Sequence, residues 1–512
     1  MSYTSETLSG QTRENLSRLS RSYHVGERRN HDRNFRVPRS HRFYLLLLSL
    51  VVSLCSIALP FFTGYANGWQ SENLYTGVMM VRGQLPYSDV FATGGFFYYL
   101  LILVSDLLGS LLWLIPFQLV FFYVAGVYFY KIVYYLSARR DVTLAFAFIF
   151  YLLNLVLGFG GLYPSQFGMP FVLIGIWFLL RYFAGLVKDE AFILYGFISA
   201  FALLFDPQSV VFWLLSFVTI GIYNLSHKHF ARGFYQLLCI IFGTLLIIYT
   251  AGYFIFNLQI LSPYIKQAFI YPFTSPTMGS DNVILAFVLQ LVVALGSGLL
   301  YGLFGTFKRK DNKIGTILLA LTTIVYLVLA LLSSDYCLYH LLPLTMYGLI
   351  LTAANFRDRS RRRAKNAGMS EVIATYIKRG FYLPALLVVI ALGHLGYRVV
   401  TMTSLNHERS LTASYVAKKT SSDDTIYVWD KVAGIYTDSK LKTGSQFALP
   451  TINTHNKTNH KNLVDSLLEA DSAYIVVNKS MTLPASISSM LKKEYKTVSI
   501  SGVKSFTVYQ KK

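Results

Sequence analysis

Long apolar runs recur along most of this chain, and they limit its fold more than any other feature. The hydrocarbon core of a bilayer is about 30 Å thick, so a helix that crosses it needs about 20 mainly apolar residues. Runs close to that length indicate eleven membrane-spanning helices. These helices are predicted at residues 43–62, 110–135, 142–159, 167–186, 190–205, 208–224, 234–256, 283–304, 314–332, 338–356 and 381–402.

The composition agrees with an α-helical polytopic membrane protein. Only 14% of the 512 residues are charged and 54% are apolar, whereas soluble domains carry about 25% charged residues. An ordinary soluble enzyme is therefore excluded, and the apolar fraction is too high for a disordered chain. Three cysteines, Cys55, Cys239 and Cys337, are too few for a disulfide scaffold or a multi-cysteine zinc site.

The placement of basic residues predicts the orientation of the chain in the cell membrane. Residues 1–42 are rich in arginine, which by the positive-inside rule indicates a disordered cytoplasmic tail. Loops expected inside the cell are also basic, as at Arg139, Arg140 and residues 357–379, whereas the outer loops carry few cations. We expect a cytoplasmic N-terminus and an outer C-terminus. Much of the net charge of +21 is then explained by the orientation of the chain in the membrane and by attraction to lipid headgroups. It does not imply a nucleic-acid partner.

The last part of the chain differs from the rest. Residues 404–512 contain no predicted span, and the membrane body is expected at 43–403. Alternating strand and helix patterns in this part predict a small extracellular α/β domain. Strands are expected at 425–429, 473–477 and 504–509, and helices at 410–420, 462–470 and 486–493.

The first outer loop, residues 63–95, carries two acids, Glu72 and Asp89, just beyond the first span. Carboxylates near a membrane boundary are candidates for function. Residues 71–82 have the spacing of a helix that lies in the membrane interface, and 96–107 resemble a second one. Asp206, followed by a proline, interrupts an apolar stretch at the outer side. It forms a tight turn or supplies a third carboxylate.

Short motifs in this loop and in a later one form a recognisable pattern. They are Ser71-Glu72-x-x-Tyr75, Gly83-x-x-Pro86-Tyr87-x-Asp89, Gly94-Gly95-x-x-x-Tyr98-Tyr99-Leu100 and Tyr336-x-x-Tyr339-His340-Leu341-Leu342-Pro343. The pattern resembles GT-C glycosyltransferases, whose bacterial members include relatives of protein O-mannosyltransferases and of lipid A aminoarabinose transferase. Ser71 stands where many members have Asp, and Gly94-Gly95 where many have a proline.

The resemblance implies an integral membrane glycosyltransferase. Such an enzyme moves a sugar from a polyprenyl-phosphate carrier to an envelope glycan, teichoic acid, lipid or protein at the outer face, with inversion expected. The leaving group is already a phosphate, so the protein must mainly deprotonate the acceptor and stabilise the departing charge. A first-loop carboxylate, Glu72 or Asp89, is the expected general base, and the residues do not decide between them. The expected substrate-binding residues are Arg82, Tyr87, Lys266, Tyr336 and His340.

A divalent metal ion near the two loop acids is compatible with the sequence but not required, and no metal ligands are assigned. Two other functions stay open. One is a transporter or flippase of lipid-linked saccharides, although charged residues near the middle of spans are few. The other is a polymerase of lipid-linked envelope polysaccharide, which would use the same donor chemistry.

Overall fold

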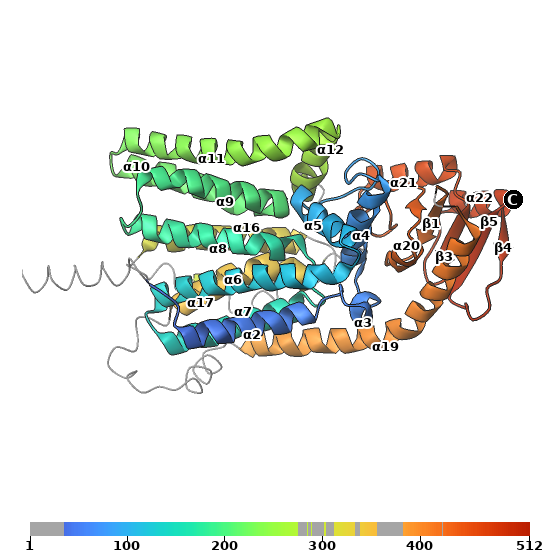
Figure 1. Cartoon of the computed structure of the whole chain (residues 1–512), viewed down its shortest axis with the longest axis horizontal. Coiled ribbons are helices and arrows are strands. Elements are labelled where there is room, and N and C mark those ends of the chain that lie inside the picture. The colour runs from blue at the N-terminus through green and yellow to red at the C-terminus, as the bar shows by residue number, and fades with distance from the viewer. Residues whose placement is uncertain are drawn as a thin grey trace, which may run out of the picture.

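The computed structural model describes residues 35–274, 284, 288, 302–303, 312–332, 338–355, 382–421 and 423–512. A bundle of long helices forms one part of the molecule, and an α/β domain stands at one end of it (Figure 1). Several predictions lie outside the described residues. They concern most of the N-terminal tail, nearly all of the span at 283–304, the basic loop at 357–379, Cys337 and Tyr336.

Among the described residues, six helices are long and apolar enough to cross a membrane. They correspond to predicted spans and are Leu111–Ser137, Arg140–Leu157, Pro164–Phe183, Pro207–Ser226, Phe230–Asn257 and Lys313–Ala330. The helices of the bundle are α2 (Arg39–Leu54), α6 (Leu114–Ser137), α7 (Arg140–Leu157), α8 (Pro164–Phe183), α9 (Phe192–Phe205), α10 (Val210–Ser226), α11 (Phe230–Asn257), α16 (Lys313–Leu332), α17 (Leu342–Ala354) and α19 (Tyr382–Lys419). Short turns η2 (Leu111–Trp113), η3 (Asp189–Ala191), η4 (Pro207–Ser209) and η6 (Leu338–Leu341) join some of them.

Two predicted spans differ in extent from the helices that form. The first, predicted to reach residue 62, ends at Leu54, because the next residues turn and Ile57 donates a backbone hydrogen bond to Gly160 O at 2.8 Å. The last, predicted at 381–402, continues without a break to Lys419. The separate helix expected at 410–420 is therefore the end of α19.

The loops that were predicted to lie outside contain α3 (Pro60–Thr63), α4 (Gly68–Met79), η1 (Met80–Arg82), α5 (Phe96–Leu107), α12 (Leu261–Tyr264), the π-helix η5 (Ile265–Ile270) and α13 (Tyr271–Thr274). The two predicted first-loop helices are thus confirmed, but α4 does not present a polar face to water. Every residue from Gln70 to Met79 is buried. A capping box between Asn67 and Gln70 fixes where α4 begins.

The α/β domain has a five-stranded sheet in the order β2-β1-β3-β5-β4. Its strands are β1 (Thr425–Trp429), β2 (Lys442–Thr443), β3 (Tyr474–Asn478), β4 (Tyr495–Val498) and β5 (Phe506–Lys511), and its helices are α20 (Gly434–Ser439), α21 (Lys457–Glu469) and α22 (Ala485–Glu494). Strand β1 runs parallel to β2 and β3, whereas β5 is antiparallel to β3 and β4. The three predicted strands are confirmed, and β2 and β4 were not predicted.

Alternation along β1 explains how the sheet is covered. Ile426 and Val428 pack on one face, in a core that also contains Tyr75 and Met79 of α4. Tyr427 and Trp429 pack on the other face, against α21 and α22. Because successive side chains of a strand point to opposite faces, one face of the sheet is left to cover the first-loop helix.

Candidate active site

An open pocket of about 100 Å³ lies where α4 meets the ends of α8, α9 and α17. Five segments that are distant in the sequence supply its wall. The residues that line it are Trp69, Asn73, Thr93, Tyr163, Pro164, Ser165, Asp206, Gln208, Tyr339, His340 and Pro343. The pocket therefore combines aromatic surface with a few polar groups, which is typical of small-molecule sites.

Asp206 supplies the carboxylate of the pocket wall. It follows the last residue of α9, and its carbonyl oxygen accepts hydrogen bonds from the backbone and side chain of Ser209 at 3.0 and 2.7 Å. The residue is 7% exposed. Burial raises the pKa of Asp206 to about 7, although a hydrogen bond from the Gln208 backbone opposes the shift. A carboxyl group with that pKa exchanges its proton near neutral pH.

Aromatic rings form another part of the wall. The rings of Tyr163 and Tyr339 stack with centroids 5.1 Å apart, and Trp69 meets Tyr339 edge-on at 6.4 Å. Asn67 Nδ2 donates a hydrogen bond to Tyr163 Oη at 2.8 Å, which ties this wall to the start of α4. His340 lies directly after Tyr339 and also faces the pocket.

Glu72 lies beside this wall, between pocket residues Trp69 and Asn73 on α4. It is 3% exposed, and its Oε1 atom has no hydrogen-bond partner among the residues that the structure describes. Burial raises the pKa of Glu72 well above its usual range. A buried acid of this kind holds its proton at a pH where an exposed glutamate has lost it.

Two family profiles match the chain. That of the Competence-induced Ccs4 N-terminal domain matches residues 30–403, and that of the Ccs4 C-terminal domain matches residues 406–512. The chain belongs to the competence-induced Ccs4 family. No curated protein matches this Ccs4-family chain in sequence.

Two solved structures resemble the Ccs4-family chain in fold. One is ArnT from Cupriavidus metallidurans bound to undecaprenyl phosphate, with a TM-score of 0.54. The other is ArnT from the same organism in the apo state, with a TM-score of 0.56. In each case the identity is 13%, and the match covers 91% of this chain and 97% of the other. The fold predicted from the loop motifs is therefore confirmed.

The structure separates the two first-loop acids of this Ccs4-family chain. Whereas Glu72 is buried beside the pocket, Asp89 is exposed and accepts a hydrogen bond from the Leu85 backbone N–H at 2.7 Å. Asp89 thus closes its own turn and is not among the described residues that line the pocket.

The predicted substrate-binding residues occupy different places. His340 lines the pocket, whereas Arg82 and Lys266 are exposed and are not among its described lining residues. Tyr87 is buried and has a φ of 69°. Binding through Arg82, Lys266 and Tyr87 stays a prediction, and Tyr336 lies outside the described residues.

The loop motifs themselves form a chain of hydrogen bonds that ends at the pocket. Tyr87 Oη donates to Gly94 O at 2.8 Å, and the Gly94 N–H donates to Tyr99 Oη at 3.1 Å. Tyr99 Oη in turn donates to Asn73 Oδ1 at 2.7 Å. These motif residues therefore orient Asn73, which lines the pocket.

Sequence patterns missed most of the wall. The break at Asp206 signalled a third carboxylate, but no local signal marked Trp69, Asn73 or Tyr163, because only the fold brings them together. Among the described residues, no three His, Cys, Asp or Glu side chains gather as metal ligands.

Proposed function

We propose that this chain is an integral membrane glycosyltransferase that moves a sugar from a polyprenyl-phosphate carrier to a cell-envelope acceptor. The observation that carries the proposal is the pocket holding Asp206 and His340 beneath α4. It occurs in a fold shared with ArnT, which has been solved with undecaprenyl phosphate. The proposed orientation has the N-terminus in the cytoplasm and both the pocket and the α/β domain at the outer face.

In the proposed reaction, a carboxylate removes the proton of an acceptor hydroxyl. The acceptor oxygen forms a bond to the anomeric carbon, the bond from that carbon to the phosphate oxygen breaks, and its electron pair leaves with the phosphate. A single displacement of this kind inverts the configuration. No oxidant or reductant is needed, because the carrier phosphate is the leaving group.

Asp206 is better placed as the base than either first-loop acid. A base must come within hydrogen-bond reach of the proton that it removes, and it works best when its pKa lies near the operating pH. Asp206 lines the pocket and has a pKa of about 7. Glu72 lies beside the wall without lining the pocket, and burial raises its pKa, so it suits the role of a neutral hydrogen-bonding group beside the site.

The leaving phosphate needs donors, and the described lining residues include no Lys or Arg. His340 and the hydroxyl groups of Tyr163 and Tyr339 are the proposed donors, since all three residues line the pocket. Hydrogen bonds to a charged oxygen are about twice as strong as neutral ones. The same aromatic wall offers flat surfaces for the sugar ring.

The test is transfer by purified protein in nanodiscs, with a panel of labelled polyprenyl-phosphate sugars and envelope extracts as acceptors. We expect transfer from at least one donor, and a loss of at least about a hundredfold for Asp206→Asn, as for removal of a general base. Asp189→Asn is the matched control, because Asp189 pairs with Arg232 at the other end of α9. In a parallel assay with proteoliposomes, movement of label across the bilayer without transfer would contradict the enzyme and support a flippase.

A further inference from the structure

Helix α19 carries the chain from the bundle into the α/β domain without a break (Figure 1). Where it enters the domain, Arg409 forms an ion pair with Asp430, the residue that follows β1. Arg409 Nε donates to Asp430 Oδ2 at 2.7 Å, and Nη2 donates to Oδ1 at 3.2 Å. Both side chains are buried, with exposures of 5% and 0%.

The remaining hydrogen bonds of Asp430 hold it in the sheet. Its Oδ1 atom accepts from Asn478 Nδ2 at 2.7 Å and from the Lys431 N–H at 2.8 Å. Asp430 and Asn478 thus stand at the carboxyl ends of the neighbouring parallel strands β1 and β3, the edge where open α/β sheets commonly bind ligands. In this domain, the guanidinium of Arg409 occupies that edge.

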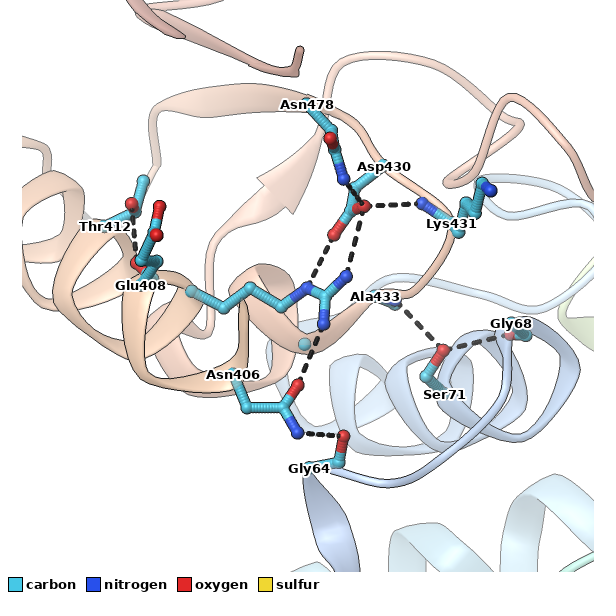
Figure 2. Close-up of polar contacts among 12 residues, drawn as sticks. Gly64, Gly68, Ser71, Asn406, Glu408, Thr412, Asp430, Lys431, Ala433 and Asn478 are labelled. Atoms are coloured by element: carbon cyan, nitrogen blue, oxygen red, sulfur yellow. Dashed lines mark hydrogen bonds and ion pairs between the residues drawn. The ribbon is translucent and has the colours of Figure 1, made fainter. Parts of the chain in front are cut away.

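The same arginine also reaches the first loop. Its Nη1 atom donates to Asn406 Oδ1 at 2.8 Å, and Asn406 Nδ2 donates to Gly64 O at 2.7 Å (Figure 2). Gly64 lies three residues before Asn67, whose side chain caps α4. Arg409 is therefore connected, through one side chain, to the segment that leads into α4.

The turn after Asp430 packs directly on α4. The Ala433 N–H donates to Ser71 Oγ at 3.0 Å, and a Cβ atom at Gly68 would lie 2.8 Å from Lys431 O. One turn further along the same face, Tyr75 Oη donates to Leu441 O at 3.2 Å. The α/β domain thus holds the face of α4 that adjoins Glu72 and the wall residue Trp69.

We propose that these contacts form a clamp that fixes α4 over the pocket, and that Arg409 and Asp430 are positioning residues for transfer. The clamp consists of Gly64, Asn406, Arg409, Asp430 and the Ser71–Ala433 contact. This inference rests on the proposed function for its catalytic consequence, but the fixing of α4 can be measured without it. A buried ion pair on its own is weak evidence that the pair stabilises a fold. This pair, together with Asn406, connects α19, the turn after β1 and the first loop.

The test compares amide hydrogen exchange and transfer kinetics in the full chain. For Arg409→Met, we expect exchange in α4 to rise several-fold while exchange in α9 and α10 stays unchanged. The kcat of transfer should fall with an unchanged pH profile, because Asp206 keeps its surroundings. Arg409→Lys should recover part of both effects, since it restores the charge but not the two-pronged geometry.

Arg232→Met is the matched control, since it breaks another arginine–aspartate pair, with Asp189, far from α4. If Arg409→Met fails to fold, Ser71→Ala removes the contact with Ala433, together with a hydrogen bond to Gly68 O inside α4, and should still raise exchange in α4. Unchanged exchange in α4 in both variants would overturn the clamp, and raised exchange with full kcat would overturn its catalytic role. A wild-type chain without transfer would refute the proposed function, and the exchange data would still decide whether α4 is clamped.

Discussion

A Cβ atom at Gly168 would lie 2.5 Å from the Cβ atom of Asp206. Helix α8 can therefore pass the end of α9 only because residue 168 has no side chain. The backbone of α8 at Gly168 packs directly against the side chain of Asp206. The position of this pocket carboxylate therefore depends on a glycine in another helix.

Gly168→Ala should displace Asp206 and reduce both stability and transfer. Overpacking of this kind costs about 1–3 kcal/mol, which should lower the thermal midpoint of the detergent-solubilised protein. Gly252→Ala in α11 is a matched control, because a Cβ atom there would meet no atom of the described residues within 4 Å. Equal midpoints and equal transfer in the two variants would contradict the close approach.

The pKa of Asp206 predicts the pH dependence of activity. A base must be deprotonated, so transfer should rise with pH and level off above about pH 7. The pH profile of kcat/KM measures this directly, and a profile that is flat between about pH 5 and about pH 9 would contradict Asp206 as the base.

Asp206→Asn should also change how stability depends on pH. The folded state disfavours the charged form, so the cost of burying this carboxylate grows as pH rises from its usual pKa of 3.8 toward about 7. That difference corresponds to at most roughly 4 kcal/mol. The thermal midpoint of the variant should therefore exceed that of the wild type above pH 7. The difference between the two midpoints should be smallest in acid.

Glu72→Gln distinguishes the pocket base from a first-loop base. Burial raises the pKa of Glu72 and so favours its neutral form. The substitution therefore replaces the carboxyl with a neutral group of the same shape. We expect most of the transfer activity to remain, with no loss of stability at neutral pH. A folded variant without transfer would instead return the base to the first loop.

Glu408 connects α19 to the α/β domain, and its lowered pKa predicts that this contact stabilises the protein less in acid. Its carboxylate accepts hydrogen bonds from the Ser505 and Lys504 N–H groups at 2.6 and 2.9 Å. Partial burial raises the pKa of Glu408, but these hydrogen bonds outweigh it, so the pKa lies below its usual 4.5. This stabilisation is present above the unfolded pKa and is lost as pH falls through the folded one.

Glu408→Gln should consequently lower the thermal midpoint near neutral pH and weaken its decrease in acid. Glu190→Gln serves as a control at the opposite end of the bundle. If the midpoints of wild type and Glu408→Gln fell in parallel between about pH 5 and about pH 3, the docking contribution of Glu408 would be refuted.

The sequence predicted those parts of the fold that follow from local patterns. Apolar length located six helices that are long and apolar enough to cross a membrane, and short alternating runs located β1, β3 and β5. It missed β2, which has only two residues, and β4, where Lys496 interrupts the apolar pattern. It also did not predict that the α/β domain covers α4, because nothing in the local spacing of that helix shows this.

The site was less predictable for the same reason. His340, which lines the pocket, belongs to a motif that the sequence shows, whereas the rest of the wall combines residues from α4, α8 and the turn at Asp206. Asp206 itself resembles an ordinary turn aspartate in sequence. Its raised pKa arises only when the surrounding helices exclude water from it.

The unbroken course of α19 has a mechanical consequence. At 1.5 Å per residue, its 38 residues extend about 57 Å, whereas a bilayer core is about 30 Å thick. Nearly half of the helix therefore extends beyond the bilayer core as a rigid segment, and the sheet is attached to the end of this segment. A change in the tilt of the span predicted at 381–402, such as one imposed by a thinner bilayer, is therefore expected to turn the sheet and to move α4 relative to Asp206.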